Sequence, residues 1–184
     1  MASKKILLHI CCGVCAGATA QKLKEEGFEI TGFFYNPNIR PIEEYEKRFE
    51  AAKTVSRILG FELLRDDTDR DEWDRISAGL KEEPEGGKRC EICFRMRLEK
   101  AFRKAKEINI PLFTTTLTIS PHKNAALINK IGAGIDSAVF LERDFKKADG
   151  FKKAIDFAKR NGIYRQNFCG CTNSVAKGRY DDGS

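Results

Sequence analysis

Short apolar segments alternate with amphipathic segments along most of the chain, and this alternation restricts the fold more than any other feature. Residues 6–10 and 28–35 are nearly continuous apolar runs, and the residues between them have helical spacing. Strands that alternate with helices pair in parallel and are covered by those helices on both faces. We therefore predict an α/β fold, a three-layer sandwich with a mostly parallel sheet.

The expected elements follow from apolar periodicity, together with Gly, Pro and Ser at the boundaries. We expect strands at 6–10, 28–35, 61–64, 113–117 and 139–141. We expect helices at 16–26, 41–58, 71–80 and 91–108, one that starts at Ser120-Pro121, and one at 151–161. Without a linker or repeat, residues 1–184 are expected to form a single domain with a core at about 5–172 and a flexible tail at 177–184.

Charge and cysteine content narrow the function. The chain has 33 Lys and Arg against 27 Asp and Glu, and this modest excess fits an anionic partner such as RNA without proving one. No apolar run approaches membrane-spanning length. The apolar run at 6–10 ends too early at Cys11 for a signal peptide, so a buried strand is expected. Seven cysteines with no secretion signal favour metal or redox chemistry in the cytoplasm.

The first cysteine group directly follows the predicted first strand and opens the first helix. It contains Cys11, Cys12 and Cys15. The free N–H groups and positive dipole end of a helix lower the pKa of thiols, and thiolate is the form that binds metal. For Cys11 or Cys12 alone, a buried core thiol remains an alternative.

Two further groups come later in the sequence. Cys90 and Cys93 form a C-x-x-C at a helix start, which suits a redox dithiol, half a zinc site or two cluster ligands. Cys169 and Cys171 flank a glycine and form a close chelating pair, for which a strained disulfide is the alternative.

The seven thiols together favour an iron–sulfur cluster over zinc. A 4Fe–4S cluster takes up to four thiolates, and a closed zinc site also needs four and no more. Any four of the seven satisfy the count. The three that remain could hold a second iron or act as catalytic thiols.

Several short motifs resemble one family, the epoxyqueuosine reductases of the QueH type, from about residue 5 to residue 172. They are His9-x-Cys11-Cys12-x-x-Cys15, Asn36-Pro37-Asn38-Ile39, Glu44-Tyr45 with Arg48, Glu83-Pro84-Glu85-Gly86-Gly87, Arg89-Cys90-x-x-Cys93, Arg97-Leu98, residues 115–121 with Lys123, residues 144–147, and Tyr164-Arg165-Gln166 with Cys169-Gly170-Cys171. Phe168 stands where the family often has Tyr, so a hydroxyl role there is not expected.

The resemblance implies a Rossmann-like fold similar to the adenine nucleotide α-hydrolase (HUP) type. It implies the last step of queuosine synthesis, a two-electron removal of the epoxide oxygen of epoxyqueuosine at the tRNA wobble position. It also implies a 4Fe–4S cluster and no cobalamin. The partners would be queuosine-family tRNA and an electron donor that the sequence does not identify.

Deoxygenation needs a proton for the leaving oxygen and a means of holding the nucleotide. We expect the proton from His9, Asp69 or Glu85, although each could be structural or merely solvated. Phosphates call for Lys or Arg, and loop bases call for aromatic stacking. The residues expected to bind substrate are Tyr35, Asn36, Tyr45, Lys123 and Arg165, with Lys146 and Lys147 as weaker candidates on what could be a solvated face.

Other functions stay open at this point. An ATP-dependent tRNA thiolase would need a Gly/Ser-rich phosphate loop where Cys11-Cys12-Gly13 stands. A zinc-bound RNA-binding module would use the cysteines structurally. A thiol switch would give the three cysteine groups no common purpose.

Overall fold

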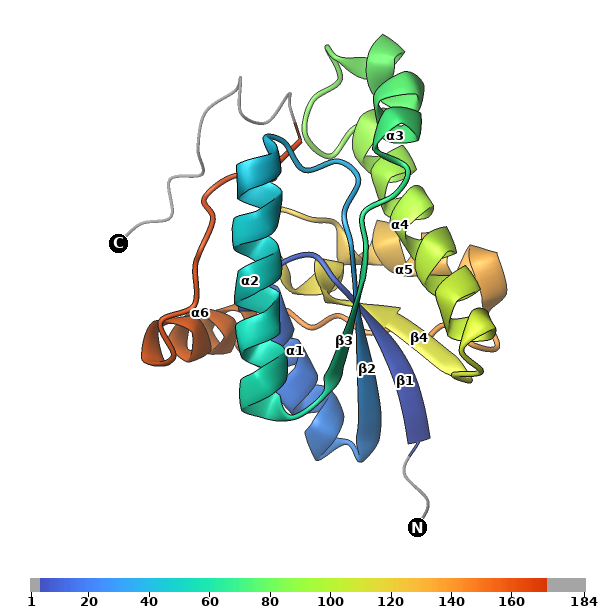
Figure 1. Ribbon diagram of the computed structural model, residues 1–184. Coiled ribbons are helices and arrows are strands. Elements are labelled where there is room, and N and C mark those ends of the chain that lie inside the picture. The colour runs from blue at the N-terminus through green and yellow to red at the C-terminus, as the bar shows by residue number, and fades with distance from the viewer. Residues whose placement is uncertain (1–3, 172–184) are drawn as a thin grey trace.

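The computed structural model describes residues 4–171, which build a four-stranded parallel sheet in the order β3-β2-β1-β4 (Figure 1). The strands are β1 (Lys4–Ile10), β2 (Phe28–Tyr35), β3 (Glu62–Asp66) and β4 (Leu112–Thr115). The expected parallel sheet is confirmed. The tail predicted at 177–184 lies outside the described residues.

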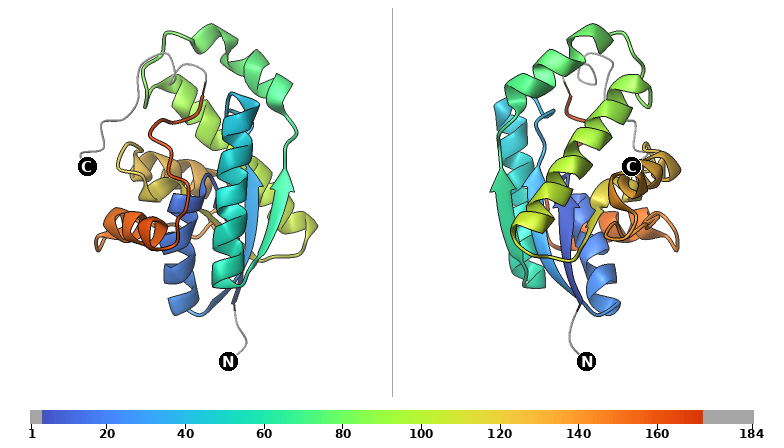
Figure 2. Two further views of the ribbon diagram at one scale, coloured as in Figure 1. Left: turned by 60° about the vertical axis from the view of Figure 1, so that its left-hand side comes forward. Right: turned by 90° about the vertical axis from the view of Figure 1, so that its right-hand side faces the viewer.

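Helices cover both faces of the sheet, as the two views in Figure 2 show. On one face lie α1 (Gly13–Glu25), α2 (Ile42–Leu59) and α6 (Gly150–Arg160), and on the other lie α4 (Lys88–Glu107) and α5 (Ala125–Asp136). The short α3 (Arg70–Ser77) and the 3-10 turn η1 (Ala78–Leu80) lie beyond the ends of the strands (Figure 1). The predicted three-layer sandwich is therefore correct.

The alternation of side chains along β1 explains the two cores. Ile6 and Leu8 pack with α1 and α2, whereas Leu7 packs with α4 and α5 on the opposite face, and all three are 0% exposed. A strand buried on both faces needs a continuous apolar run, which is what the sequence provides.

The structure corrects the sequence predictions first in the region between β4 and α5. The strand expected at 113–117 ends at Thr115, because the chain turns into a 3-10 helix, η2 (Thr116–Ile119). The next helix does not begin at Ser120. Ser120 is extended, and α5 begins at Ala125, where the Asn124 side chain accepts a hydrogen bond from the Leu127 N–H (3.1 Å) and caps the helix.

The last predicted strand, 139–141, is reduced to one parallel bridge between Phe113 and Phe140. Helix α4 begins at Lys88, three residues before the predicted start. Within the residues described, no helix is long and apolar enough to cross a membrane.

The strand order determines where a ligand can bind. From β1 the chain moves to β2 and β3 on one side, and later to β4 on the other side. The connections after β1 and β4 therefore diverge, which leaves a crevice at the carboxyl ends of these two strands. Cys11 directly follows β1 and Thr116 directly follows β4, so both lie at this crevice.

Gly17 allows α1 and α6 to pack closely, and its replacement tests that packing. A Cβ at Gly17 would clash with the Phe157 ring, so G17A should lower the free energy of unfolding by about 1–3 kcal/mol in urea denaturation. The matched control is G134A in α5, where a Cβ meets nothing within 4 Å; it should be neutral or stabilise by about 0.4–1 kcal/mol. Equal effects of the two substitutions would contradict this packing.

Candidate metal and active site

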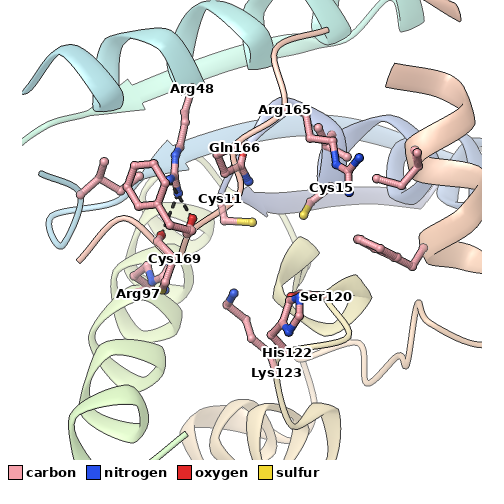
Figure 3. A pocket seen from close by; sticks show the side chains of 15 residues that line it. Cys11, Cys15, Arg48, Arg97, Ser120, His122, Lys123, Arg165, Gln166 and Cys169 are labelled. Carbon is pink, nitrogen blue, oxygen red and sulfur yellow. Dashed lines mark hydrogen bonds between the residues drawn. The ribbon is translucent and has the colours of Figure 1, made fainter. Parts of the chain in front are cut away.

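Three thiols converge where β1 passes into α1. The sulfur atoms of Cys11, Cys12 and Cys15 all lie within 4.8 Å of one another. Cys12 is the N-cap of α1, and its sulfur accepts a hydrogen bond from the Cys15 N–H (3.4 Å). Figure 3 shows Cys11 and Cys15 directed into the same pocket.

Cys11 is the thiol of this group that is poised to ionise. Hydrogen bonds from Cys12 and Cys15 hold the pKa of Cys11 well below its usual value, although burial opposes this. The Thr116 hydroxyl, 3.2 Å from the Cys11 sulfur, and the charge of Lys123 also lower that pKa. The same hydrogen bonding raises the pKa of Cys12 to about 12 and raises that of Cys15, so one thiolate is shared among the three sulfurs.

The second thiol pair lies in the first turn of α4. The Gly86 N–H donates to the Cys90 sulfur (3.2 Å), and Arg97 Nη2 donates to the Cys93 sulfur (3.1 Å). Burial raises the pKa of both thiols, and for Cys93 the charge of Arg97 opposes this. Arg97 is 3% exposed, and its Nη1 donates to Asn36 Oδ1 (3.0 Å). A buried guanidinium thus faces a thiol directly.

The third pair lies on an irregular segment after α6. The Arg48 guanidinium donates to the carbonyl oxygens of Phe168 (3.0 Å) and Cys169 (2.8 Å). A hydrogen bond with Cys171 holds the pKa of Cys169 well below its usual value, against burial, and Lys123 and Arg97 add to the effect. The disulfide alternative for Cys169 and Cys171 is not observed, because both are free thiols.

Six of the seven cysteines line two adjoining pockets. The first pocket, drawn in Figure 3, includes Cys11, Cys15 and Cys169. The second pocket includes Cys90, Cys93, Cys169 and Cys171. The two pockets share Cys169 and the cationic side chains Arg97 and Lys123. Cys12 lines neither pocket and is 1% exposed, which fits the alternative of a buried thiol.

The donor set fits a metal group bound through sulfur. Thiols from three segments face two adjoining pockets, and the buried Arg97 and the partly buried Lys123 stand beside them. Thiolate ligands bring negative charge, which a buried site tolerates only if positive groups compensate it. The three close cysteines Cys11, Cys12 and Cys15 are consistent with a metal or an iron–sulfur cluster.

The three expected proton donors are in different surroundings. His9 is 0% exposed; its Nε2 donates to the Tyr35 carbonyl (3.0 Å), so its Nδ1 accepts from the Thr115 hydroxyl (2.8 Å). Burial, with the charge of Arg97, lowers the pKa of His9 to about 4 and keeps the ring neutral. Glu85 lines the second pocket beside the cysteines.

Asp69 lies in a separate network at the start of α3. Its Oδ2 accepts from Lys100 Nζ (2.8 Å) and from the Tyr35 hydroxyl (3.0 Å). The hydrogen bond from Lys100 is the main reason that the pKa of Asp69 is lowered, so this carboxylate stays ionised. Neither His9 nor Asp69 lines the two pockets.

The residues expected to bind substrate fall into two groups, those that line the pockets and those that do not. Lys123 lines both pockets and Arg165 lines the first. Tyr45 is 0% exposed and packs edge-on against Phe34, so it lies in the core. Three more of these residues have partners elsewhere: the Tyr35 hydroxyl bonds Asp69, the Asn36 side chain bonds Arg97 and the Ile10 carbonyl, and Lys146 Nζ donates to the Lys123 carbonyl (2.9 Å).

Two buried arginines and a threonine were not among the predicted site residues. Arg97 follows Cys93 by four residues, the helical spacing that places two side chains on one face, so C-x-x-C-x-x-x-R is the signal that could have revealed it. Arg48 likewise follows Glu44 by four. No local pattern marks Thr116, because its contact with Cys11 depends on the pairing of β1 with β4.

Solved structures with low sequence identity share the fold. NMN synthetase from Francisella tularensis matches with a TM-score of 0.58 at 13% identity, covering 98% of this chain and 71% of that one. The U34-tRNA thiolase NcsA from Methanococcus maripaludis, solved with its [4Fe-4S] cluster, matches with a TM-score of 0.60 at 13% identity, covering 95% and 62%. These similarities show that the α/β fold of this chain is shared with both proteins.

Sequence relatives are much closer. The protein from Histophilus somni named epoxyqueuosine reductase QueH is 37% identical, over 93% of this chain and 72% of its own length. Two further proteins of the same name match over a similar extent. The one from Streptococcus pyogenes is 38% identical, over 90% of this chain and 68% of its own length. The one from Thermotoga maritima is 34% identical, over 95% of this chain and 92% of its own length. The family model described as epoxyqueuosine reductase QueH matches residues 6–177, a range that contains all three cysteine groups. With this extent and identity, the chain belongs to the epoxyqueuosine reductase QueH family.

Proposed function

We propose that this protein reduces epoxyqueuosine to queuosine in tRNA. Family membership supports the reaction, and the observation that carries it into this structure is the convergence of six cysteines on two adjoining pockets at the crevice of the sheet. The reaction breaks both C–O bonds of the epoxide and forms a carbon–carbon double bond. It consumes two electrons from an external reductant and two protons, and the oxygen leaves as water.

The cysteines divide between two metal-binding roles in this proposal. Cys90, Cys93, Cys169 and Cys171 line one pocket and match the four thiolates of a 4Fe–4S cluster. Cys11 and Cys15, with Cys12 close by, would hold a second iron. When bound, such groups supply electrons and a Lewis acid.

The protein's own side chains bind the substrate and supply protons. Burial lowers the pKa of Lys123, but the nearby thiolates of Cys169 and Cys11 raise it, and the net effect is a raised pKa. Lys123 is therefore a cation that lines both pockets. Its charge, and that of Arg165 at the first pocket, suit the phosphates of an anticodon loop. Glu85, beside the cysteines of the second pocket, is the best placed of the three expected proton donors.

The proposal also covers the cellular compartment of the protein and its domain organisation. A reducing cytoplasm keeps cysteines available for metal. All seven are free thiols, which suits that compartment. We further propose that residues 1–184 form a single domain, since the described helices pack on one sheet.

The alternative functions fit the structure less well. An ATP-dependent thiolase would bind phosphate at the start of α1, but there the Cys15 N–H is bonded to the Cys12 sulfur. A zinc-bound RNA-binding module needs only four thiols, whereas six cysteines line the two pockets. Family membership favours the reductase over both.

The first test is the metal content of the protein purified without oxygen. We expect about four sulfide and up to about five iron per chain, with a brown colour that bleaches under reductant. Such protein should convert epoxyqueuosine in tRNA to queuosine when given a reductant, as read by mass spectrometry of the nucleosides. Zinc alone, retained after anaerobic reconstitution with iron and sulfide, would refute the proposal.

Single cysteine substitutions should separate the two metal roles. C90A and C93A should lose most of the iron and sulfide together with the visible spectrum, because each removes a ligand of the second pocket. C11A and C15A should keep the spectrum but lose activity and any iron in excess of the cluster. Loss of the full spectrum in C11A would instead assign Cys11 to the cluster.

The proton donor can be tested with isosteric amides. E85Q should lower the rate of deoxygenation by about 10²-fold or more, as expected for a general acid. D69N is the matched control, because Asp69 pairs with Lys100 and Tyr35 outside both pockets; it should stay within about threefold of the unsubstituted protein. The opposite order of the two rates would place the proton donor at Asp69.

A further inference from the structure

A buried arginine from α2 holds the loop that carries the last two cysteines. Arg48 is 3% exposed, and its two terminal nitrogens donate to the carbonyl oxygens of Phe168 and Cys169 at 3.0 and 2.8 Å. These bonds are drawn in Figure 3, which shows the Arg48 side chain reaching across to the loop at Cys169. The guanidinium also lies against the Phe168 ring, 5.1 Å from its centroid.

The Arg48 side chain is itself positioned by Glu44, one helical turn earlier in α2. Its Nε donates to Glu44 Oε1 (2.6 Å), and the Tyr164 hydroxyl donates to Glu44 Oε2 (2.7 Å). Tyr164 begins the segment that ends at the cysteine loop. Two points of that segment are therefore tied to one turn of α2.

The loop is shaped to accept the guanidinium. Gly170 has a φ of +100°, and a Cβ there would lie 2.9–3.0 Å from the Arg48 guanidinium, so no larger residue fits without displacement. The Arg40 N–H donates to the Gly170 carbonyl (2.8 Å) and fixes the next peptide. Three consecutive carbonyls, those of residues 168, 169 and 170, are thus bonded to α2 or to the residues that lead into it.

We propose that Arg48 is a positioning residue that holds the loop of Cys169, Gly170 and Cys171 in its metal-binding conformation before the metal arrives. The inference rests on the proposed metal site. The loop lies outside the helices and strands, so nothing in regular secondary structure orders its two thiols. Ligands that are ordered in advance lose less entropy when metal binds, and changing groups that orient ligands typically costs 10–100-fold in metal affinity.

The geometry argues against a role limited to the ion pair. A buried pair contributes little to stability because the charges lose their hydration. Only one nitrogen of Arg48 faces Glu44, whereas the other two face carbonyls of the cysteine loop. Lysine cannot reproduce this fork of donors, so R48K keeps the charge and removes the positioning.

The test compares R48K with R57K, an exposed arginine on the same helix. Each protein is reconstituted anaerobically with iron and sulfide, and the release of iron to a coloured chelator is timed. R48K should release iron about 10–100-fold faster than the unsubstituted protein, whereas R57K should not differ from it. Equal release from R48K and the unsubstituted protein would overturn the proposal.

A second measurement needs no metal. Amide hydrogen exchange of the metal-free proteins should show faster exchange at the Arg40 amide, which donates to the Gly170 carbonyl of the loop, in R48K than in R57K, with the strands equally protected in both. Unchanged protection of the Arg40 amide in R48K would overturn the proposal. If the unsubstituted protein takes up no iron, the proposed function fails, and this exchange measurement still decides the role of Arg48.

The swapped variant E44R/R48E separates positioning from pairing. It preserves both buried charges, but a glutamate at residue 48 cannot donate to the carbonyls of the loop. Because E44R also removes the acceptor of the Tyr164 hydroxyl, the swapped variant is compared with Y164F, which lacks only that bond. Rapid iron release from a swapped protein with intact thermal unfolding supports positioning. Slow release, equal to that of the unsubstituted protein, would show that the ion pair alone suffices.

Discussion

Negative charge on the partly buried sulfur atoms of Cys11 and Cys169 is the charge that the rest of this structure must balance. The pKa values of Cys11, which lines the first pocket, and of Cys169, which lines both pockets, are held well below their usual range. An uncompensated charge there would be very unfavourable, because the surroundings polarise far less than water. The compensating positive charges are those of Arg97 on α4 and Lys123 before α5, so residues of the helical layer on one face of the sheet interact electrostatically with the thiols.

The order of the strands in the sheet determines where the charged thiols and their partners meet. Cys11 follows β1, and Thr116, which bonds its sulfur, follows the adjacent β4. The connection after β2 supplies Asn36, which bonds both the Ile10 carbonyl and Arg97. The ends of β1, β2 and β4 therefore each contribute a contact to a site that no single segment could form. The thiols of α4 and of the last loop reach the same place only because these strands pair in parallel.

A feature of the structure could be predicted from the sequence where it depends on neighbouring residues, and not where it depends on contacts between residues far apart in the chain. The apolar runs located the strands, and the cysteine groups located the site, because strand ends of a parallel sheet share one edge. The start of α5 was wrong because Ser120 and Asn124 are both good N-caps, and the 3-10 turn of η2 decides between them. A polar residue whose role depends on a distant partner was harder to assign.

Tyr35, Asn36 and Tyr45 illustrate that limit. Their residue types suit RNA contact, yet Tyr35 bonds Asp69, and Tyr45 fills the core. Conversely, Arg48 and Arg97 are of a type that is normally exposed, and both are 3% exposed here. Only the three-dimensional pairing of α2 with the last loop, and of α4 with the strand ends, reveals why these two are inside.

The buried arginines also bear on the kind of chemistry that the thiols perform. A disulfide is neutral and needs no cation beside it, whereas a metal group bound by thiolates carries negative charge. Arg97 bonds the Cys93 sulfur directly, and Lys123 is stabilised as a cation by the thiolates of Cys169 and Cys11. A buried Arg97 and a partly buried Lys123 without anionic partners would be unfavourable. The balance of charge therefore favours a site in which Cys11 and Cys169 stay reduced and ionised, which is the state that metal ligation requires.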